Sequence, residues 1–168
     1  MTFRDRLHYN SDAGTYHDGD MRYIFIKPEA FMGVALEMPE ELRPAIFEAM
    51  ARTVMLNGGK SAEAYKNRGA RDPDALLAVI RETAGQLGWG KWHIETGSDR
   101  LTVTVKDSPF AAGYGASDRP VCGPIKGMLA AVSGMIFDAP TVVEEVTCAA
   151  MGANHCTFVA SVAPGDRP

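Results

Sequence analysis

Three cysteines and a glutamate in the C-terminal part of the chain carry side chains that can bind a metal ion. The cysteines are Cys122, Cys148 and Cys156, and Glu145 lies between the first two. All four fall within 35 residues of a 168-residue chain. Three thiolates and one carboxylate suit tetrahedral Zn²⁺. We therefore expect these four side chains to form one metal site.

The elements predicted around these residues would bring them together. Cys122 begins a predicted helix, where the helix dipole and free N–H groups stabilise the thiolate that a metal needs. Cys148 and Cys156 flank a predicted turn at residues 152–154, which would fold them towards each other. Glu145 and Cys148 would point to opposite faces of a regular strand, so the strand must bulge or end between them.

Spacing alone leaves two interpretations open. Cys-x₇-Cys, the spacing of Cys148 and Cys156, is not a general zinc pattern, and buried cysteines also serve as inert core residues. His155 is an alternative ligand, although we expect it to face solvent on the opposite side of its strand. Glu144 competes with Glu145 for the carboxylate position. The residues themselves do not decide between the two glutamates.

The composition narrows the classes of protein to consider. A net charge of −4 argues against nucleic acid as the main partner, because no basic surplus is present to neutralise phosphates. No apolar run reaches the roughly 18 residues that a membrane span needs. Residues 1–14 lack the apolar core of a signal peptide. We therefore expect the protein to be located in the cytoplasm, a compartment in which disulfides are uncommon.

The first half of the chain predicts an arm, a strand and helices. Residues 1–20 are polar and rich in Gly and Asp, and we expect a partly ordered arm there. Residues 21–26 predict a strand, since they are mostly β-branched, aromatic or apolar. A helix opens at Pro39 and reaches a stop signal at residues 57–59, and a weaker helix follows over 61–68.

The second half predicts a helix followed by two hairpins with a further helix between them. Asp72 and Pro73 are typical of a helix start. The expected elements then follow as a hairpin over 89–95 and 101–106, a long loop over 107–120, a helix over 122–137, and strands over 141–149 and 156–162. The order β-α-(α)-α-β-β-α-β-β predicts one α+β domain over residues 21–163, with helices packed on a mostly antiparallel sheet and a tail at 164–168.

Residues 87–162 resemble the 4-vinyl reductase domain, a family of small-molecule-binding modules. The matching runs are G-W-G at 88–90, D-S-P-F-A at 107–111, V-C-G-P-I-K-G at 121–127 and E-V-T-C-A-A-M-G-A-N-H-C-T-F at 145–158. The most specific feature is E-x₂-C-x₃-G-x₃-C-x-F with a cysteine 23 residues before the glutamate. The resemblance implies that Cys122, Glu145, Cys148 and Cys156 hold a structural zinc, and it favours Glu145 over Glu144.

The resemblance also implies a fold and a range of functions. Similar domains sense phenols and other aromatics at the front of bacterial transcription activators, where the zinc lies beside an apolar pocket and the domain dimerises. The domain also occurs alone, in a protein encoded with bacteriochlorophyll biosynthesis enzymes. This chain has no G-x₄-G-K-[ST] motif and no helix-turn-helix segment, so it is more similar to the stand-alone form. The implied fold is shared with aromatic-sensor domains and with vesicle-tethering subunits of the Bet3 type.

We therefore expect a zinc-containing protein that binds an apolar or aromatic small molecule. The first expectation is a carrier or accessory protein for a tetrapyrrole intermediate of bacteriochlorophyll biosynthesis. One alternative is a sensor of phenol-like aromatics that acts through a partner protein, as a homodimer. Another is a vinyl reductase, but no G-x-G-x-x-G motif follows a predicted strand to bind a hydride donor, so we expect no catalytic residues.

Aromatic and methionine side chains near the expected site are the candidates for a ligand pocket. They can pack against an apolar ligand, and a histidine could also donate a hydrogen bond to it. The candidates are Tyr23, Phe25, Trp89, Trp92, His93, Phe110, Tyr114, Met128 and Phe137.

Overall fold

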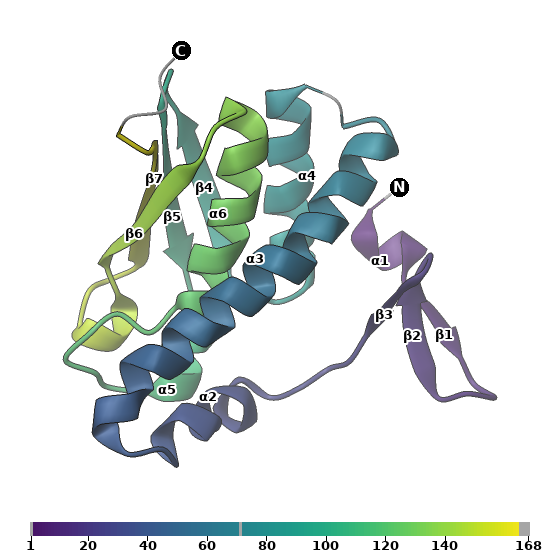
Figure 1. The fold of residues 1–168 in the computed structure, drawn as a ribbon. Helices are drawn as coiled ribbons and strands as arrows, with labels where there is room; N and C mark the ends of the chain where they lie inside the picture. The colour runs from purple at the N-terminus through teal and green to yellow at the C-terminus, as the bar shows by residue number, and fades with distance from the viewer. Residues whose placement is uncertain (1, 71, 165–168) are drawn as a thin grey trace.

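A computed structural model describes residues 2–70 and 72–164 of the chain (Figure 1). The helices are α1 (Phe3–Arg6), α2 (Pro28–Leu36), α3 (Arg43–Asn67), α4 (Pro73–Gln86), α5 (Pro109–Tyr114) and α6 (Gly123–Phe137), with 3₁₀ turns η1 (Glu40–Leu42) and η2 (Ala149–Met151). The strands are β1 (His8–Asn10), β2 (Thr15–Asp18), β3 (Met21–Tyr23), β4 (Lys91–Thr96), β5 (Arg100–Lys106), β6 (Thr141–Thr147) and β7 (Cys156–Val162). Among these elements, no helix is both long and apolar enough to cross a membrane.

The strands form two antiparallel sheets. The larger one has the order β4-β5-β7-β6, and the smaller one has the order β1-β2-β3. Leu101, Val103 and Val105 alternate along β5 and are fully buried, because α4 and α6 cover that face of the larger sheet (Figure 1). The predicted α+β class, with helices on a mostly antiparallel sheet, is confirmed.

Helix α3 continues through the stop signal predicted at residues 57–59 and ends only at Asn67. That prediction is wrong because the glycines serve helix packing here. A Cβ added at Gly58 would lie 2.7 Å from the Cε of Met128 on α6, and one added at Gly59 would lie 3.5 Å from the Cβ of Ala131, so both glycines face the helix that packs on α3. Tertiary contact thus outweighs the low helix propensity of glycine.

The N-terminal residues adopt more regular structure than their composition predicts. Residues 2–20, expected as a partly ordered arm, contain α1, β1 and β2. Asp18 of β2 is 2% exposed and pairs with Arg6 and with Arg68 at the end of α3, each at 3.1 Å. The strand predicted over 21–26 ends at Tyr23, and the three residues after it are exposed in the connection to α2 (Figure 1).

Most other predicted elements occur close to their expected positions. Asp72 caps α4, since its carboxylate accepts a hydrogen bond from the Ala75 N–H at 2.8 Å. The two predicted hairpins form as β4–β5 and β6–β7. The loop predicted over 107–120 contains the short helix α5, which Ser108 caps. The tail beyond residue 164 lies outside the described residues.

Candidate metal centre and ligand pocket

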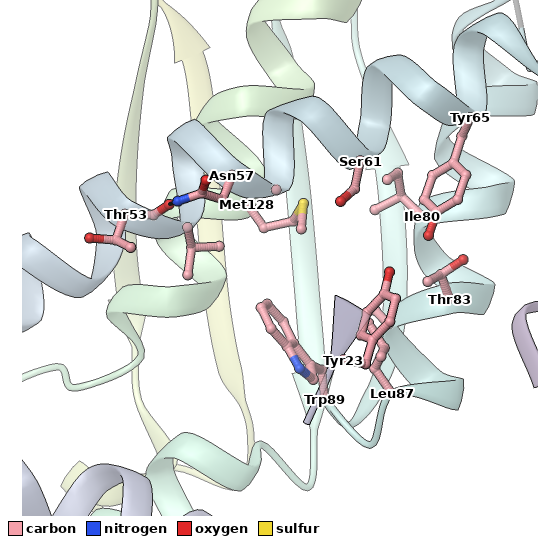
Figure 2. Close-up of a pocket in the computed structure, with 13 residues that line it drawn as sticks. Tyr23, Thr53, Asn57, Ser61, Tyr65, Ile80, Thr83, Leu87, Trp89 and Met128 are labelled. Atoms are coloured by element: carbon pink, nitrogen blue, oxygen red, sulfur yellow. Dashed lines mark hydrogen bonds between the residues drawn. The ribbon is translucent and has the colours of Figure 1, made fainter. Parts of the chain in front are cut away.

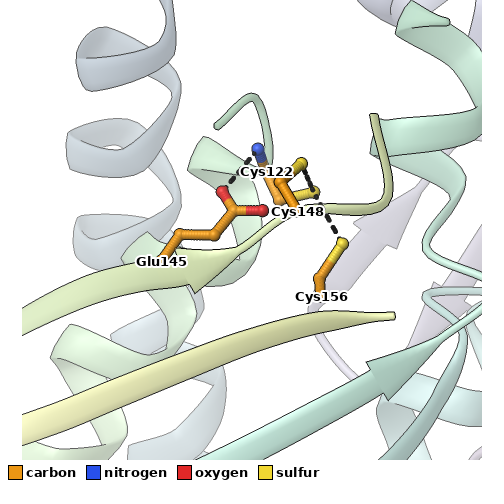
Figure 3. A group of neighbouring side chains, drawn as sticks. All are labelled: Cys122, Glu145, Cys148 and Cys156. Atoms are coloured by element: carbon orange, nitrogen blue, oxygen red, sulfur yellow. Dashed lines mark hydrogen bonds between the residues drawn. The ribbon is translucent and has the colours of Figure 1, made fainter. Parts of the chain in front are cut away.

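Four side chains from three segments converge at the N-terminus of α6 (Figure 3). Cys122 occupies the N-cap position of α6, Glu145 lies on β6, Cys148 follows that strand, and Cys156 begins β7. One ligand atom from each residue lies within 4.8 Å of all the others. The three cysteines are buried. These four residues could hold a metal ion.

An irregularity in β6 allows Glu145 and Cys148 to face the same point. The register between β6 and β7 shifts between Glu145 and Thr147, and the strand ends at Thr147. A regular strand would have placed the two side chains on opposite faces. Gly152, in the left-handed conformation with φ of 90°, then turns the chain back towards Cys156. The predicted bulge or strand end between Glu145 and Cys148 is confirmed.

The spacing of the sulfur atoms fits a tetrahedral metal. Cys122 Sγ lies 3.6 Å from Cys156 Sγ and 4.0 Å from Cys148 Sγ. Tetrahedral thiolates at about 2.3 Å from zinc lie about 3.8 Å from one another. Glu145 Oε2 accepts a hydrogen bond from the Cys122 N–H at 3.0 Å, while its buried Oε1 has no hydrogen-bond partner among the described residues. A cation at the centre would give that oxygen a partner.

The two rival ligands, Glu144 and His155, are not part of this group of side chains. Glu144 is exposed, whereas Glu145 is half-buried, and both line one surface groove. His155 is half-buried, and its carbonyl oxygen accepts a hydrogen bond from the Thr147 hydroxyl at 3.2 Å. Neither residue belongs to the cluster of ligand atoms.

The acid–base properties of the cluster reflect crowding of ionisable groups. Burial, and then the neighbouring Cys148, raise the pKa of Glu145 to about 8. Hydrogen bonds from Cys122, from Cys148 and from the Ala149 N–H lower the pKa of Cys156 to about 4. The two other sulfurs, and then burial, raise the pKa of Cys122. Without a cation, the site therefore favours one thiolate and disfavours ionisation of the other side chains. A divalent metal would neutralise the negative charge of several ionised ligands.

A serine that sequence reasoning did not single out contacts this cluster. Ser108 Oγ lies 3.3 Å from Cys122 Sγ, and it also accepts a hydrogen bond from the Ala111 N–H at 3.5 Å. Ser108 is 2% exposed. The Ser-Pro pair at residues 108–109 is typical of a helix start, so the sequence could have predicted the cap. Nothing in the local sequence indicates the contact with Cys122.

An apolar cavity of about 270 Å³ lies between α3, α4 and α6 (Figure 2). Its lining residues are Tyr23, Thr53, Val54, Asn57, Gly58, Ser61, Tyr65, Ile80, Thr83, Ala84, Leu87, Trp89 and Met128. Three of the nine predicted pocket residues, Tyr23, Trp89 and Met128, are among them. Phe25 and Phe110 instead line an adjoining groove of about 400 Å³.

The other four predicted pocket residues lie away from both hollows. Trp92 is buried, and its Nε1–H donates to the Trp89 carbonyl oxygen at 3.0 Å. His93 is 72% exposed on the outer face of β4. Tyr114 packs edge-to-face on Phe47 in the core. Phe137 is half-buried at the end of α6.

Polar side chains in the cavity were missed by sequence reasoning. Thr53, Asn57, Ser61 and Tyr65 recur at every fourth position of α3 and line the cavity together. This spacing places them in one row on the helix. The regular spacing of these residues could have indicated a polar row on one helix. The predicted helix break at residues 57–59 hid it, because it placed the four residues on two separate helices. Burial, and then the neighbouring Tyr65, raise the pKa of Tyr23.

One part of the chain matches a known protein family in sequence, and most of the chain is similar in fold to solved structures. Residues 101–162 match the family model described as the V4R domain. Among curated proteins, no sequence match is found. The phenol-responsive sensory domain of the transcription activator PoxR, solved with phenol, has a TM-score of 0.78 at 16% identity, covering 95% of this chain and 86% of that one.

Two further solved structures are similar. A vinyl-4-reductase family protein from Methanocaldococcus jannaschii has a TM-score of 0.50 at 14% identity, covering 80% of this chain and 89% of that one. A trafficking protein particle complex subunit 3 from Naegleria fowleri, covalently bound to palmitic acid, has a TM-score of 0.58 at 12% identity, covering 84% and 98%. These likenesses show the fold. The match of residues 101–162 to the V4R domain model confirms the resemblance drawn from the sequence.

Proposed function

We propose that this chain binds an aromatic small molecule in the cavity between α3 and α4, and that a zinc ion at Cys122, Glu145, Cys148 and Cys156 stabilises the fold beside it. The observation that carries the proposal is the composition of the cavity wall. Trp89, Met128 and other apolar side chains supply most of the wall, while a row of polar groups from α3 lines one side (Figure 2). Small-molecule sites commonly combine an apolar wall with a few placed polar groups.

The polar groups suit a ligand with one hydroxyl or carbonyl substituent. Ser61 and Thr83 carry hydroxyls that can donate or accept, and Tyr23 adds a phenol whose hydroxyl points towards Tyr65 of α3 (Figure 2). Trp89 and Met128 would contact the face and edge of an aromatic ring. The phenol-responsive sensory domain of PoxR, which has the same fold, supports this class of ligand.

The size of the cavity favours a single-ring compound. Its volume of about 270 Å³ lies just below the roughly 300–1,000 Å³ typical of ligand pockets. A tetrapyrrole from bacteriochlorophyll biosynthesis has a macrocycle of four rings and would need a larger opening. We therefore place the tetrapyrrole second to a phenol-like aromatic.

The metal would have a structural role. A set of four protein ligands leaves no open position, which distinguishes structural from catalytic zinc sites. This favours binding or sensing over turnover of a vinyl group. A sensor of this kind would pass its signal through a homodimer or a partner protein.

Isothermal titration of purified protein with a panel of phenol, catechol, benzoate and a porphyrin tests the ligand. We expect phenol to bind one-to-one with a Kd in the micromolar range, that is, about −8 kcal/mol or weaker. Val54→Trp, which fills the cavity, should abolish binding. Leu56→Trp adds the same side chain to α3 at a residue that is 63% exposed and should not change binding. Failure of every compound to bind the wild type would refute the proposal.

Mass spectrometry of the untagged protein tests the metal. We expect one zinc per chain. Glu145→Ala should lower zinc affinity by about tenfold or more, because a ligand is lost. Glu144→Ala on the same strand should leave it unchanged. Equal losses in the two variants would contradict the assignment of Glu145.

A further inference from the structure

We propose that the ligand is elongated: its ring occupies the cavity between α3 and α4, and an unbranched apolar tail lies in the adjoining groove beneath the connection from β3 to α2. This proposal rests on the proposed function and names its ligand class more closely. The groove has a volume of about 400 Å³, and Phe31, Pro109 and Phe110 are among the residues that line it.

The cavity and the groove share part of their walls. Tyr23, Leu87 and Trp89 line both hollows. In Figure 2 these three side chains lie together at the end of the cavity opposite Ser61. A ligand whose polar head contacts α3 would therefore have its opposite end directed towards the groove.

A row of aromatic rings leads from the cavity into the groove. Trp89 packs edge-to-face on Phe110, with ring centroids 5.1 Å apart. Phe110 in turn packs edge-to-face on Phe31 at 6.1 Å. The row gives a tail a continuous apolar surface to lie against. Arg22 is the one charged residue among the groove-lining residues that the structure describes, so the groove suits an uncharged tail.

Three exposed apolar residues of the connection from β3 to α2 also line the groove. Ile24, Phe25 and Ile26 are 75%, 68% and 54% exposed, and all three line the groove. Contiguous exposed apolar surface marks binding sites. The hollow shape of this surface and its shared walls with the cavity favour the tail of the same ligand over a protein partner.

The combined volume also supports a longer ligand. The cavity alone is near the lower limit for a ligand pocket, whereas the cavity and groove together fall well inside the usual range. Burial of one CH₂ group contributes about 0.8 kcal/mol, or about fourfold in affinity, when it leaves water completely. A half-open groove should give about twofold for each CH₂.

Titration calorimetry with phenol, 4-ethylphenol, 4-butylphenol and 4-hexylphenol tests the proposal on the full chain. We expect the affinity to rise by about twofold to fourfold for each added CH₂. An affinity that stays constant or falls from 4-ethylphenol to 4-hexylphenol would overturn the elongated ligand while leaving the binding of phenol intact. Absence of binding by phenol and by all its derivatives would instead refute the proposed function as well.

Two exposed substitutions separate the groove from general adsorption to apolar surface. Ile26→Glu puts a carboxylate in the groove wall; it should leave the Kd of phenol within about twofold and weaken 4-hexylphenol by about tenfold, because several CH₂ groups lose their apolar contact. Leu56→Glu changes a residue that lines neither hollow and should affect neither compound. Equal losses of 4-hexylphenol binding in both variants would overturn the proposal. So would a change in oligomeric state in Ile26→Glu with unchanged binding of 4-hexylphenol, since the groove would then be a protein interface.

Discussion

Ser108 Oγ lies 3.3 Å from Cys122 Sγ, and both residues are buried. This contact joins the cysteine cluster to α5, which Ser108 caps. Two residues further on, Phe110 packs against Trp89, a wall of the cavity. The candidate metal centre and the candidate ligand pocket are therefore connected through one short helix, although no single residue belongs to both.

Ser108→Ala should weaken metal binding. A hydroxyl that donates to a thiolate stabilises its negative charge, and loss of such a partner typically lowers metal affinity by about 10- to 100-fold. Competition with a chromophoric chelator measures this. Ser133→Ala removes another buried hydroxyl, one that donates to the Leu129 carbonyl oxygen at 2.6 Å away from the cluster. That variant should lose stability but keep its metal affinity, and equal effects of the two on the metal would contradict the role of Ser108.

Local patterns predicted those parts of the fold that depend on neighbours in sequence. Asp72 caps α4 as its position before Pro73 predicts, and Val103 and Val105 alternate inward on β5 as their spacing predicts. The four candidate metal ligands were found because their types and spacing repeat a family pattern, and the structure brings them together.

The remaining features depend on contacts between distant residues. Gly58 and Gly59 predict the end of a helix. Helix α3 nevertheless continues past them because α6, about 70 residues later in the chain, packs on it. Asp18 orders the N-terminal segment by pairing with Arg68, 50 residues away. Ser61 could be assigned to the cavity only once α4 and Trp89 were known to face it. No local periodicity encodes such pairings.

Gly127→Ala should destabilise the protein by about 1–3 kcal/mol, the usual cost of overpacking. A Cβ at this position would collide with the carbonyl oxygen of Ala51, because α6 lies directly against the backbone of α3. Gly134→Ala on the same helix meets nothing closer than 3.7 Å and should be neutral or stabilising by up to about 1 kcal/mol. Urea denaturation of both variants measures the difference. Equal stability of the two would show that α3 and α6 are not in close contact at Gly127.

Tyr23 should ionise only at a pH well above the ordinary pKa of a tyrosine. Burial, and then Tyr65, raise its pKa above the ordinary value of 10.0, so the fold favours the neutral phenol. The stabilising contribution of that phenol is complete below pH 10 and is lost as the pH rises through the raised pKa. Tyrosinate absorbance during an alkaline titration measures this: Tyr23→Phe should remove absorbance that develops above pH 10. Loss of absorbance that develops at or below pH 10 would contradict the environment described for Tyr23.

The methyl resonances of the methionines test most directly whether an aromatic ligand occupies the cavity. Met128 lines the cavity, and its side chain points into it (Figure 2). Met55 and Met151 are exposed and line neither the cavity nor the groove. In protein labelled with ¹³C-methyl methionine, addition of phenol should shift the Met128 methyl resonance and give intermolecular NOEs from the phenol ring to it, with Met55 and Met151 unchanged. Saturating phenol that leaves Met128 unchanged, or that shifts only the exposed methionines, would contradict ligand binding in this cavity.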